Sequence, residues 1–262
     1  MAALDGKIAL VTGAGRGIGA AIARHLASAG ATVILSARTE SELNSLCGRI
    51  QAEGGKAHVE VLDVVDAAAC AKLVERICSE HGSLDVLVNN AGIAETAPIK
   101  STTDELWDRI MAVNVRGPFV LSRLASRAMR AKGWGRIVNI ASTAGRVGYA
   151  YTAAYCASKH ALVGMTRAFS KECVAEGVTV NAVCPGYVET DITAGAIENI
   201  ARVTSLTEAQ AREELDSDSP LGRMARPDEV ATAVMLFVGE GSDAMSGQAL
   251  GVCGGSVEGG AA

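Results

Sequence analysis

The stretch Thr12-Gly-Ala-Gly-Arg-Gly-Ile-Gly19 decides the fold expected for this chain. It follows a short apolar run at 7–12 and opens a helical pattern over 17–29. Glycines there allow a tight turn, and the first turn of the helix directs free N–H groups and positive dipole at a pyrophosphate. A merely structural turn is the alternative, but the strand–turn–helix context that a dinucleotide-binding motif requires is present. The predicted cofactor contacts in this stretch are Gly13, Gly15, Arg16, Gly17, Ile18 and Gly19.

The same alternation continues along the chain. Short runs rich in Val, Ile and Leu predict buried strands at 7–12, 32–36, 57–62, 84–88, 136–140, 179–183 and 249–252. Helical patterns lie between them at 17–29, 39–53, 66–81, 103–131, 152–176 and 227–239. Because repeated β-α units form parallel sheets with helices on both faces, we expect one α/β domain over 1–262. Its fold is a doubly wound, Rossmann-like parallel sheet of about seven strands.

One region, near 187–226, departs from this alternation. It has no strand pattern, one polar helix around Thr207–Leu215 and a loop at 216–220. A connection of this length is too long for an ordinary turn and suggests a substrate lid, with a surface insertion as the alternative.

Composition narrows the class of protein. A net charge of −5 argues against a nucleic-acid binder, which needs a basic face. Seven cysteines and four histidines are scattered without metal-ligand spacing, so we expect reduced thiols and no metal site. The sequence lacks both a run of about 18 uncharged apolar residues and the layout of a signal peptide. We therefore expect a cytoplasmic protein with no membrane partner.

The end of the second predicted strand indicates which dinucleotide binds. An acidic residue there would bind the ribose 2′-hydroxyl of NAD, but the sequence reads Leu35-Ser-Ala-Arg38. Arg38 is placed to meet a 2′-phosphate, and Arg16 could flank the same group. This pattern predicts NADP(H) rather than NAD(H), although two exposed arginines without a ligand remain an alternative.

A second stretch, Tyr151-Thr-Ala-Ala-Tyr-Cys-Ala-Ser-Lys-His160, carries candidate acid/base chemistry. Tyr155 and Lys159 are four residues apart and share a helix face. A phenol has an ordinary pKa of about 10, and a nearby ammonium lowers it. Tyr151 lies two turns from Lys159, near the expected helix start, where it can at most wall a substrate pocket.

Together these motifs resemble the short-chain dehydrogenase/reductase family over residues 5–255. The segments that carry the resemblance are Thr12–Gly19, Asn89-Asn-Ala-Gly92, Asn114, Ser142, Tyr155-x-x-x-Lys159 and Pro185-Gly-x-x-x-Thr190. The sequence looks most like aromatic-polyketide ketoreductases and 3-oxoacyl-thioester reductases in four segments: 139–145, 155–160, 181–190 and 252–255.

The resemblance implies roles for four catalytic residues. Tyr155 exchanges a proton with the carbonyl oxygen, and Ser142 hydrogen-bonds the same oxygen. Lys159 binds the nicotinamide ribose and lowers the tyrosine pKa, while Asn114 supports a water of the proton relay. The further cofactor contacts that it implies are Asp63, Val64, Asn90, Ala91, Gly92, Pro185, Gly186, Val188 and Thr190. It also implies a homotetramer assembled through the helices at 103–131 and 152–176.

The substrate is the least determined part of this interpretation. Candidate contacts besides Ser142 are Glu95, Tyr149, Tyr151 and Tyr187, in walls that are otherwise small and apolar. Two departures from the resemblance are Ile93-Ala-Glu95, where polyketide enzymes have Pro-Gly-Gly, and Glu176, which would repel an acidic carrier protein.

Three hypotheses remain open at this point. The first is an NADP(H)-dependent enzyme that interconverts a ketone and a secondary alcohol, on a 3-oxoacyl thioester or a similar hydrophobic ketone. The second is an NAD(P)-dependent catabolic dehydrogenase of a free cyclic or hydroxylated alcohol. The third is a non-catalytic NADP-binding regulator, since a fold does not entail a function.

Overall fold

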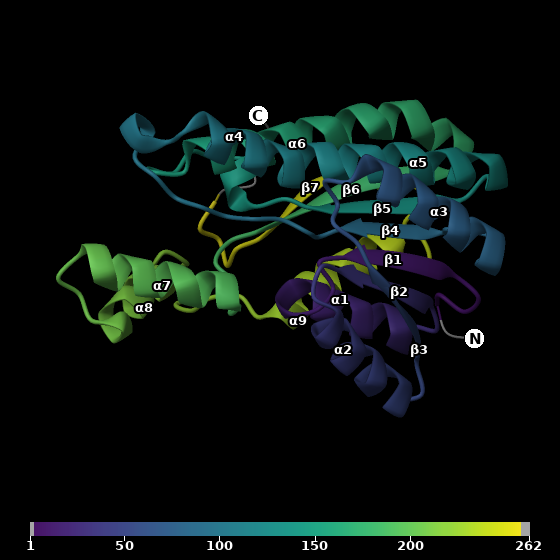
Figure 1. Cartoon of the computed structure of the whole chain (residues 1–262), viewed down its shortest axis with the longest axis horizontal. Helices are drawn as coiled ribbons and strands as arrows, with labels where there is room; N and C mark the ends of the chain where they lie inside the picture. The colour runs from purple at the N-terminus through teal and green to yellow at the C-terminus, as the bar shows by residue number, and fades with distance from the viewer. Residues whose placement is uncertain (1–2, 258–262) are drawn as a thin grey trace.

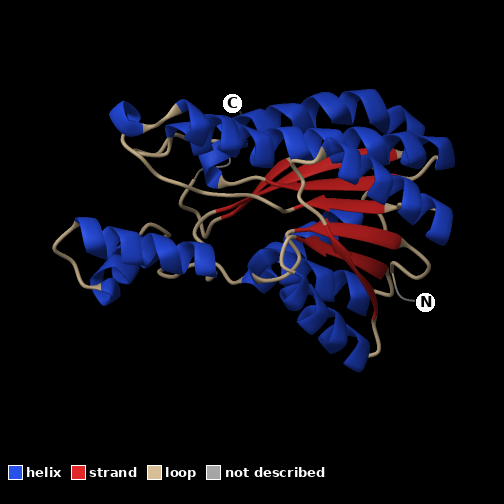
Figure 2. Cartoon of the chain, viewed as in Figure 1, coloured by secondary structure: helices blue, strands red, loops and turns tan. Residues whose placement is uncertain are grey.

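The computed structural model describes residues 3–257 and contains a seven-stranded parallel sheet of order β3-β2-β1-β4-β5-β6-β7 (Figures 1 and 2). The strands are β1 (Ile8–Thr12), β2 (Thr32–Ala37), β3 (Lys56–Val61), β4 (Val86–Asn89), β5 (Gly135–Ile140), β6 (Val178–Pro185) and β7 (Ala249–Val252). Each lies within two residues of its predicted position. The strands β1, β4, β5 and β6 are buried along their whole length, which favours runs of apolar residues, whereas the edge strand β3 is partly exposed. The predicted doubly wound fold is confirmed.

Helices cover both faces of the sheet (Figure 1). One face carries α1 (Gly17–Ser28), α2 (Glu40–Ala52) and α9 (Pro227–Val238), and the other carries α3 (Ala67–His81), α5 (Gly117–Lys132) and α6 (Ala153–Cys173). Short 3-10 turns lie at Ile99–Ser101, Thr143–Gly145 and Val174–Glu176.

Each face has its own apolar core. Leu26, Leu46 and Phe237 are buried on the first, and Leu121 and Met129 on the second. Full burial of one such side chain contributes roughly 1.5–3 kcal/mol to stability. The two cores therefore hold the sheet rigidly, and its strand ends are available to position other groups.

The order of the strands reverses between β1 and β4, where they pair side by side. Ligands of open parallel sheets bind at such a switch point, outside the carboxyl ends of the strands. This edge carries Gly13 after β1, Arg38 after β2, Asn90 after β4 and Ser142 after β5, together with Pro185 at the end of β6.

The long helix predicted at 103–131 is interrupted. It consists of α4 (Asp104–Met111), a π turn at Ala112–Arg116, and α5. A Cβ on Gly117, the first residue of α5, would lie 3.0 Å from the carbonyl oxygen of Val64, so the helix passes close to the end of β3 there. Single π turns inside helices are often found at functional sites, and this one contains Asn114.

The region at 187–226 holds two helices where the sequence predicts one. The predicted polar helix is α8 (Glu208–Ser217), and α7 (Asp191–Val203) precedes it. The helices share a small core of Ile197, Ala211, Leu215 and Met224, and they project beyond the edge of the sheet (Figure 1, green). A parallel bridge between Val188 and Ala225 joins the two ends of this projection.

No helix within residues 3–257 is long and apolar enough to cross a membrane.

Candidate active site

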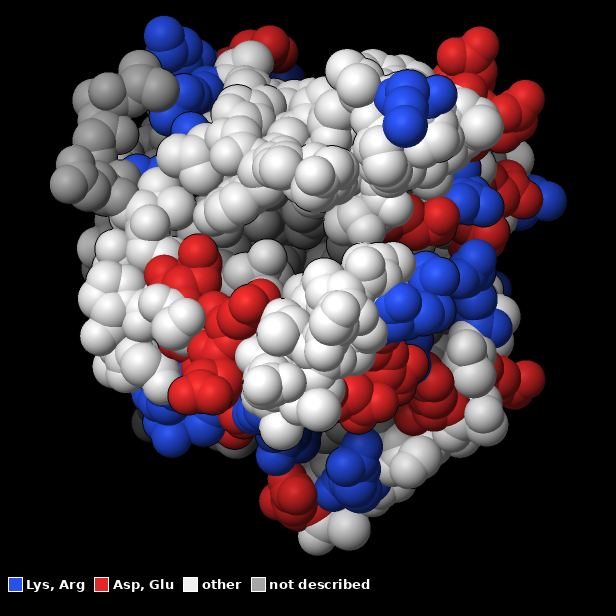
Figure 3. Space-filling view, turned by 90° about the vertical axis from the view of Figure 1, so that its left-hand side faces the viewer, with Lys and Arg blue, Asp and Glu red and all other residues white. Residues whose placement is uncertain are grey.

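A cleft of about 320 Å³ runs along the carboxyl ends of the strands, and its opening appears as the hollow in Figure 3. It brings together every cofactor residue predicted from the sequence and three of the four predicted catalytic residues. The predicted residues that line it are Gly13, Gly15, Arg16, Gly17, Ile18, Gly19, Arg38, Asp63, Val64, Asn90, Ala91, Gly92, Ser142, Tyr155, Lys159, Pro185, Gly186, Val188 and Thr190.

In the glycine turn, the backbone at Gly19 packs directly against the backbone at Gly13. A Cβ on Gly19 would lie 2.2 Å from the carbonyl oxygen of Gly13, a distance that no side chain can occupy. Asn90 Nδ2 donates to the carbonyl oxygens of Thr12 and Gly13 at 2.9 and 3.0 Å, and Thr12 Oγ1 accepts from the backbone N–H groups of Asn90 and Ala91. The turn is therefore fixed to the end of β4, and the N-terminus of α1 faces the cleft.

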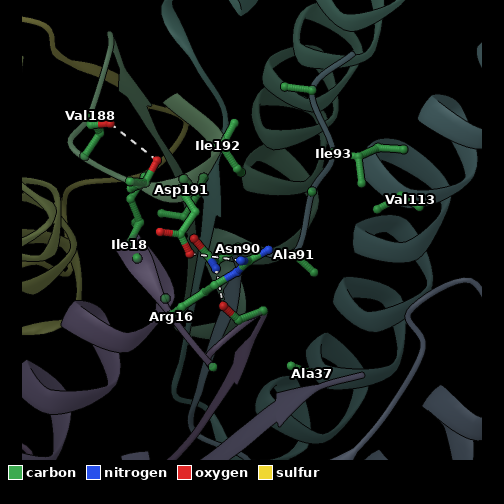
Figure 4. A pocket seen from close by; sticks show the side chains of 18 of the residues that line it. Arg16, Ile18, Ala37, Asn90, Ala91, Ile93, Val113, Val188, Asp191 and Ile192 are labelled. Atoms are coloured by element: carbon green, nitrogen blue, oxygen red, sulfur yellow. Dashed lines mark hydrogen bonds and ion pairs between the residues drawn. The ribbon is translucent and has the colours of Figure 1, made fainter. Parts of the chain in front are cut away.

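The two arginines of the predicted phosphate site behave differently. Arg38 is exposed at the end of β2, and within residues 3–257 its side chain has neither an ion pair nor a hydrogen bond. Arg16 instead points toward α7, where its Nη1 lies 2.9 Å from Oδ2 of Asp191 (Figure 4). Arg16 therefore lines the cleft and makes an ion pair with the first residue of α7.

Two further polar groups line this end of the cleft. The Glu42 side chain lies against the glycine turn, because a Cβ on Gly15 would be 2.6 Å from its Oε2. The hydroxyl of Ser36 is buried and has no hydrogen-bond partner within the described residues. A buried hydroxyl without a partner is costly, so a cleft lined by one is suited to a polar ligand.

The opposite end of the cleft holds the tyrosine and lysine of α6. Both lie on the helix face that meets the loop after β5, and a Cβ on Gly145 would be 2.7 Å from the carbonyl oxygen of Lys159. Only glycine allows this approach. On the same side of the helix, Ser142 forms a side-chain hydrogen bond with the hydroxyl of Tyr155. Ser142 Oγ also accepts from the N–H of Ala144 at 3.1 Å, which fixes its orientation.

Burial shifts the pKa values of both ionisable groups on α6. It raises the pKa of Tyr155 to about 12, although the hydrogen bond with Ser142 acts in the opposite direction. It lowers the pKa of Lys159 to about 8, and Lys159 Nζ donates to the carbonyl oxygen of Ile140 at 2.9 Å. The Lys159 ammonium lies 5.6 Å from the ring centroid of Tyr155, and burial of the phenol is the largest cause of its raised pKa.

Asn114 lies behind the cleft rather than in its lining. Its Oδ1 accepts from the N–H of Ile93, and its Nδ2 donates to the carbonyl oxygen of Ile93 and to Ser158 Oγ, at 2.9 to 3.1 Å. A Cβ on Gly92 would lie 3.3 Å from Asn114 Oδ1 and 3.6 Å from Lys159 Nζ. Asn114 therefore holds the chain after β4 beside the lysine.

The predicted substrate residues divide into two groups. Tyr149 is half-buried and donates to Thr143 Oγ1 at 3.0 Å, and Tyr187 is close enough to Tyr155 to affect its pKa. Burial raises the pKa of both Tyr149 and Tyr187, and the negative charge of Asp218 raises it further. These two phenols therefore form a polar rim beside Tyr155.

The other two predicted substrate residues are Glu95 and Tyr151, and like Tyr149 and Tyr187 they are not among the residues that line the cleft. Glu95 pairs with Arg109 on α4 at 2.5 Å. Tyr151 is 67% exposed with a φ of 65°, and its carbonyl oxygen accepts from the N–H of Ala97. The helix starts at Ala153, so Tyr151 does not share the face of Tyr155. The suggestion that Tyr151 walls the pocket is not supported by this geometry.

Sequence reasoning missed Glu42, Ser36 and Asp191 as cleft residues. Glu42 lies in the first turn of α2, which begins two residues after Arg38, so its closeness in the sequence to Arg38 was the only available signal. Asp191 follows directly after the predicted contact Thr190, but without α7 in the prediction nothing indicated its direction.

A family model of short chain dehydrogenases matches residues 7–201. A relative from Streptomyces virginiae, named for a ketoacyl reductase of the monensin polyketide synthase, is 41% identical over 95% of this chain and 96% of its own length. The 3-oxoacyl-[acyl-carrier-protein] reductase of Escherichia coli is 38% identical over 96% and 97%. The crystal structure of a single-residue variant of the actinorhodin polyketide ketoreductase with NADPH superposes with a TM-score of 0.93, at 40% identity, over 98% of this chain and 99% of that one.

Proposed function

The chain belongs to the short-chain dehydrogenase family, and on that premise we propose that it is an NADP(H)-dependent oxidoreductase that interconverts a ketone and a secondary alcohol. The observation that carries the proposal is the convergence of Ser142, Tyr155 and Lys159 at one end of a cleft that has a glycine turn and Arg38 at the other. The ketoreductase names of its relatives and the NADPH in the actinorhodin enzyme support it.

The residues of the cleft fit this dinucleotide. The glycine turn leaves no space for side chains at Gly13 and Gly19, and the buried hydroxyl of Ser36 has no partner among the described residues. In our proposal the N-terminus of α1 holds the pyrophosphate and Arg38 holds the 2′-phosphate. The other proposed contacts are Asp63 and Val64 for the adenine, Asn90, Ala91 and Gly92 for the middle, Tyr155 and Lys159 for the nicotinamide ribose, and Pro185, Gly186, Val188 and Thr190 for the nicotinamide.

When bound, NADPH would supply the hydride for reduction, and the chain supplies the proton. Tyr155 donates its hydroxyl proton to the ketone oxygen, which Ser142 also hydrogen-bonds. A pKa of about 12 keeps the phenol protonated at neutral pH. The same property makes a phenolate base scarce, so the rate of alcohol oxidation near neutral pH should be limited by the small phenolate fraction.

We propose a 3-oxoacyl thioester or a similar hydrophobic ketone as the substrate. Ile93, Ala94 and Ile192 give the cleft an apolar wall. Outside this lining, Tyr187 lies near Tyr155 and Tyr149 lies near Tyr187, so both supply phenol hydroxyl groups on that side. The pair α7–α8 serves as the lid. Glu176, which was expected to repel an acidic carrier, forms an ion pair with Arg130, and this pairing reduces the expected repulsion.

A substrate panel tests the proposal. The purified protein is mixed with NADPH or NADH and with free cyclic ketones, 3-oxoacyl-coenzyme A thioesters and 3-oxoacyl carrier-protein thioesters, and nicotinamide absorbance is followed. We expect turnover with NADPH on at least one class of ketone. Tight NADPH binding without turnover of any ketone in this panel, or of the corresponding alcohols with NADP⁺ or NAD⁺, would instead identify a regulator.

A charge reversal tests the cofactor assignment separately. Arg38→Asp should abolish the preference for NADPH over NADH, because the carboxylate repels the 2′-phosphate and can accept from a ribose hydroxyl. An unchanged preference would show that Arg38 does not bind the phosphate.

A further inference from the structure

The ion pair between Arg16 and Asp191 joins two parts of the cleft that are 175 residues apart in the sequence. Arg16 is the residue before α1, and Asp191 is the first residue of the lid helix α7. The neighbouring residues also touch, since a Cβ on Gly17 would lie 3.2 Å from Thr190 Cγ2. Figure 4 shows the two side chains pointing toward one another among the residues that line the pocket. The base of the lid therefore rests on the glycine turn.

This ion pair is weak and can be exchanged. The two side chains are 62% and 69% exposed, and exposed pairs contribute at most about 1 kcal/mol. A phosphate monoester carries about −1.5 to −2 charge near neutral pH and can accept two parallel hydrogen bonds from one guanidinium. A 2′-phosphate in this cleft would therefore attract Arg16 more strongly than Asp191 does.

Asp191 can be left without its partner at little cost. It is exposed to solvent, and it lies in the first turn of α7, where the helix dipole stabilises a carboxylate. Arg16 and Arg38 line the same cleft. A change of side-chain rotamer is therefore enough to turn Arg16 from Asp191 toward a ligand in that cleft.

We propose that Asp191 competes with the 2′-phosphate of the coenzyme for Arg16, and so limits the affinity and selectivity for NADPH. This inference rests on the proposed binding of NADPH. When the phosphate takes Arg16, the base of α7 loses its ion pair to the glycine turn. Formation of the Arg16–Asp191 ion pair and binding of NADPH are then linked equilibria. The factor by which the ion pair weakens NADPH binding equals the factor by which bound NADPH weakens the ion pair. NADH lacks the phosphate and leaves the pair intact.

Binding titrations test the competition without any turnover. The dissociation constants of NADPH, NADH and adenosine 2′,5′-bisphosphate are measured by calorimetry for wild type, Asp191→Asn, Arg16→Gln and the double variant. Asp228→Asn is the matched control, because Asp228 pairs with Arg24 on α1 at 3.2 Å, is similarly exposed, and lies outside the cleft lining. It removes the same charge without touching Arg16.

We expect Asp191→Asn to tighten NADPH and the bisphosphate about two- to fivefold, and NADH hardly at all. Arg16→Gln should weaken NADPH and remove the effect of Asp191→Asn, while Asp228→Asn should change nothing. Weaker NADPH binding in Asp191→Asn would overturn the proposal, because it would show that the Arg16–Asp191 ion pair stabilises the bound coenzyme. An equal gain for NADH, or a gain that persists in the Arg16→Gln background, would also overturn it. A wild-type protein that binds no NADPH would refute the proposed function itself.

Discussion

The two ends of the cleft are built from different kinds of contact. At the glycine turn the backbone makes the contacts, and a Cβ on Gly19 would meet the carbonyl oxygen of Gly13 at 2.2 Å. At the catalytic end ionisable side chains make them, and burial shifts the pKa values of Tyr155 and Lys159 in opposite directions. The first end should therefore respond to added volume and hardly to pH, and the second should respond to lost polar atoms and to pH.

The largest expected effect comes from removal of one oxygen at the catalytic end. Tyr155→Phe should lower kcat for ketone reduction by about 10²- to 10⁴-fold, since general acid catalysis contributes that much. Affinity for adenosine 2′,5′-bisphosphate should stay unchanged. Steady-state kinetics and calorimetry measure the two quantities. Near-normal kcat in Tyr155→Phe, with a loss in Tyr151→Phe, would show that the acid has been assigned to the wrong tyrosine.

The second effect is a difference in pH dependence between the two directions of reaction. Below a pKa of about 12 the phenolate fraction of Tyr155 grows about tenfold per pH unit, so alcohol oxidation should rise from about pH 7 to about pH 10 without a plateau. Ketone reduction needs the protonated phenol and should be nearly constant from about pH 6 to about 7, above which Lys159, with its pKa of about 8, loses its proton. A plateau of the oxidation rate near neutral pH would mean that the working phenol ionises near neutrality.

A single methyl group at the glycine turn should have the third effect. Gly19→Ala must displace backbone, so we expect a loss of about 1–3 kcal/mol in the free energy of unfolding, together with weaker NADPH binding. Gly48→Ala is the control: it adds a methyl group to an exposed position of α2 with nothing within 4 Å, and should stabilise by about 0.5–1 kcal/mol. Denaturant unfolding distinguishes them. Equal free energies of unfolding for Gly19→Ala and Gly48→Ala would show that the glycine turn is not sensitive to added volume.

The smallest expected effect is at the rim beside the catalytic end. Tyr151 has a φ of 65°, a conformation that costs a side chain about 1 kcal/mol and glycine almost nothing. Tyr151→Gly should leave the free energy of unfolding equal or slightly higher, with activity within about twofold of wild type. Denaturant unfolding and steady-state kinetics measure the two quantities. A large loss of activity in Tyr151→Gly would indicate that the Tyr151 side chain contacts the substrate.

The sequence predicts the strands and the glycine turn well because their patterns are local. Runs rich in apolar residues define the central strands, and the glycine motif at 13–19 is recognised from the strand and helix next to it. The helix α7 escapes prediction because its interior includes Thr193 and Gly195, both poor helix formers, and its few buried residues pack on α8 rather than on the sheet.

The directions of individual side chains are the least predictable part. Arg16 lies at the turn as expected, but its partner Asp191 is 175 residues away on a helix that the sequence does not predict. Glu95 and Tyr151 are expected in the pocket from their positions in the sequence, but Glu95 pairs with Arg109, and Tyr151 is exposed with a positive φ. Such contacts are long-range or depend on one backbone angle, and no local pattern encodes them.

The strand order has a consequence for how the chain is made. Beginning from β1, each new strand adds to an outer edge of the strands already present: β2 and β3 on one side, then β4 to β7 on the other. No strand has to insert between two that are already paired, so the sheet can grow in the order in which a ribosome delivers it. The edge left behind on one side is β3, whose polar Lys56, His58 and Glu60 discourage pairing with another chain.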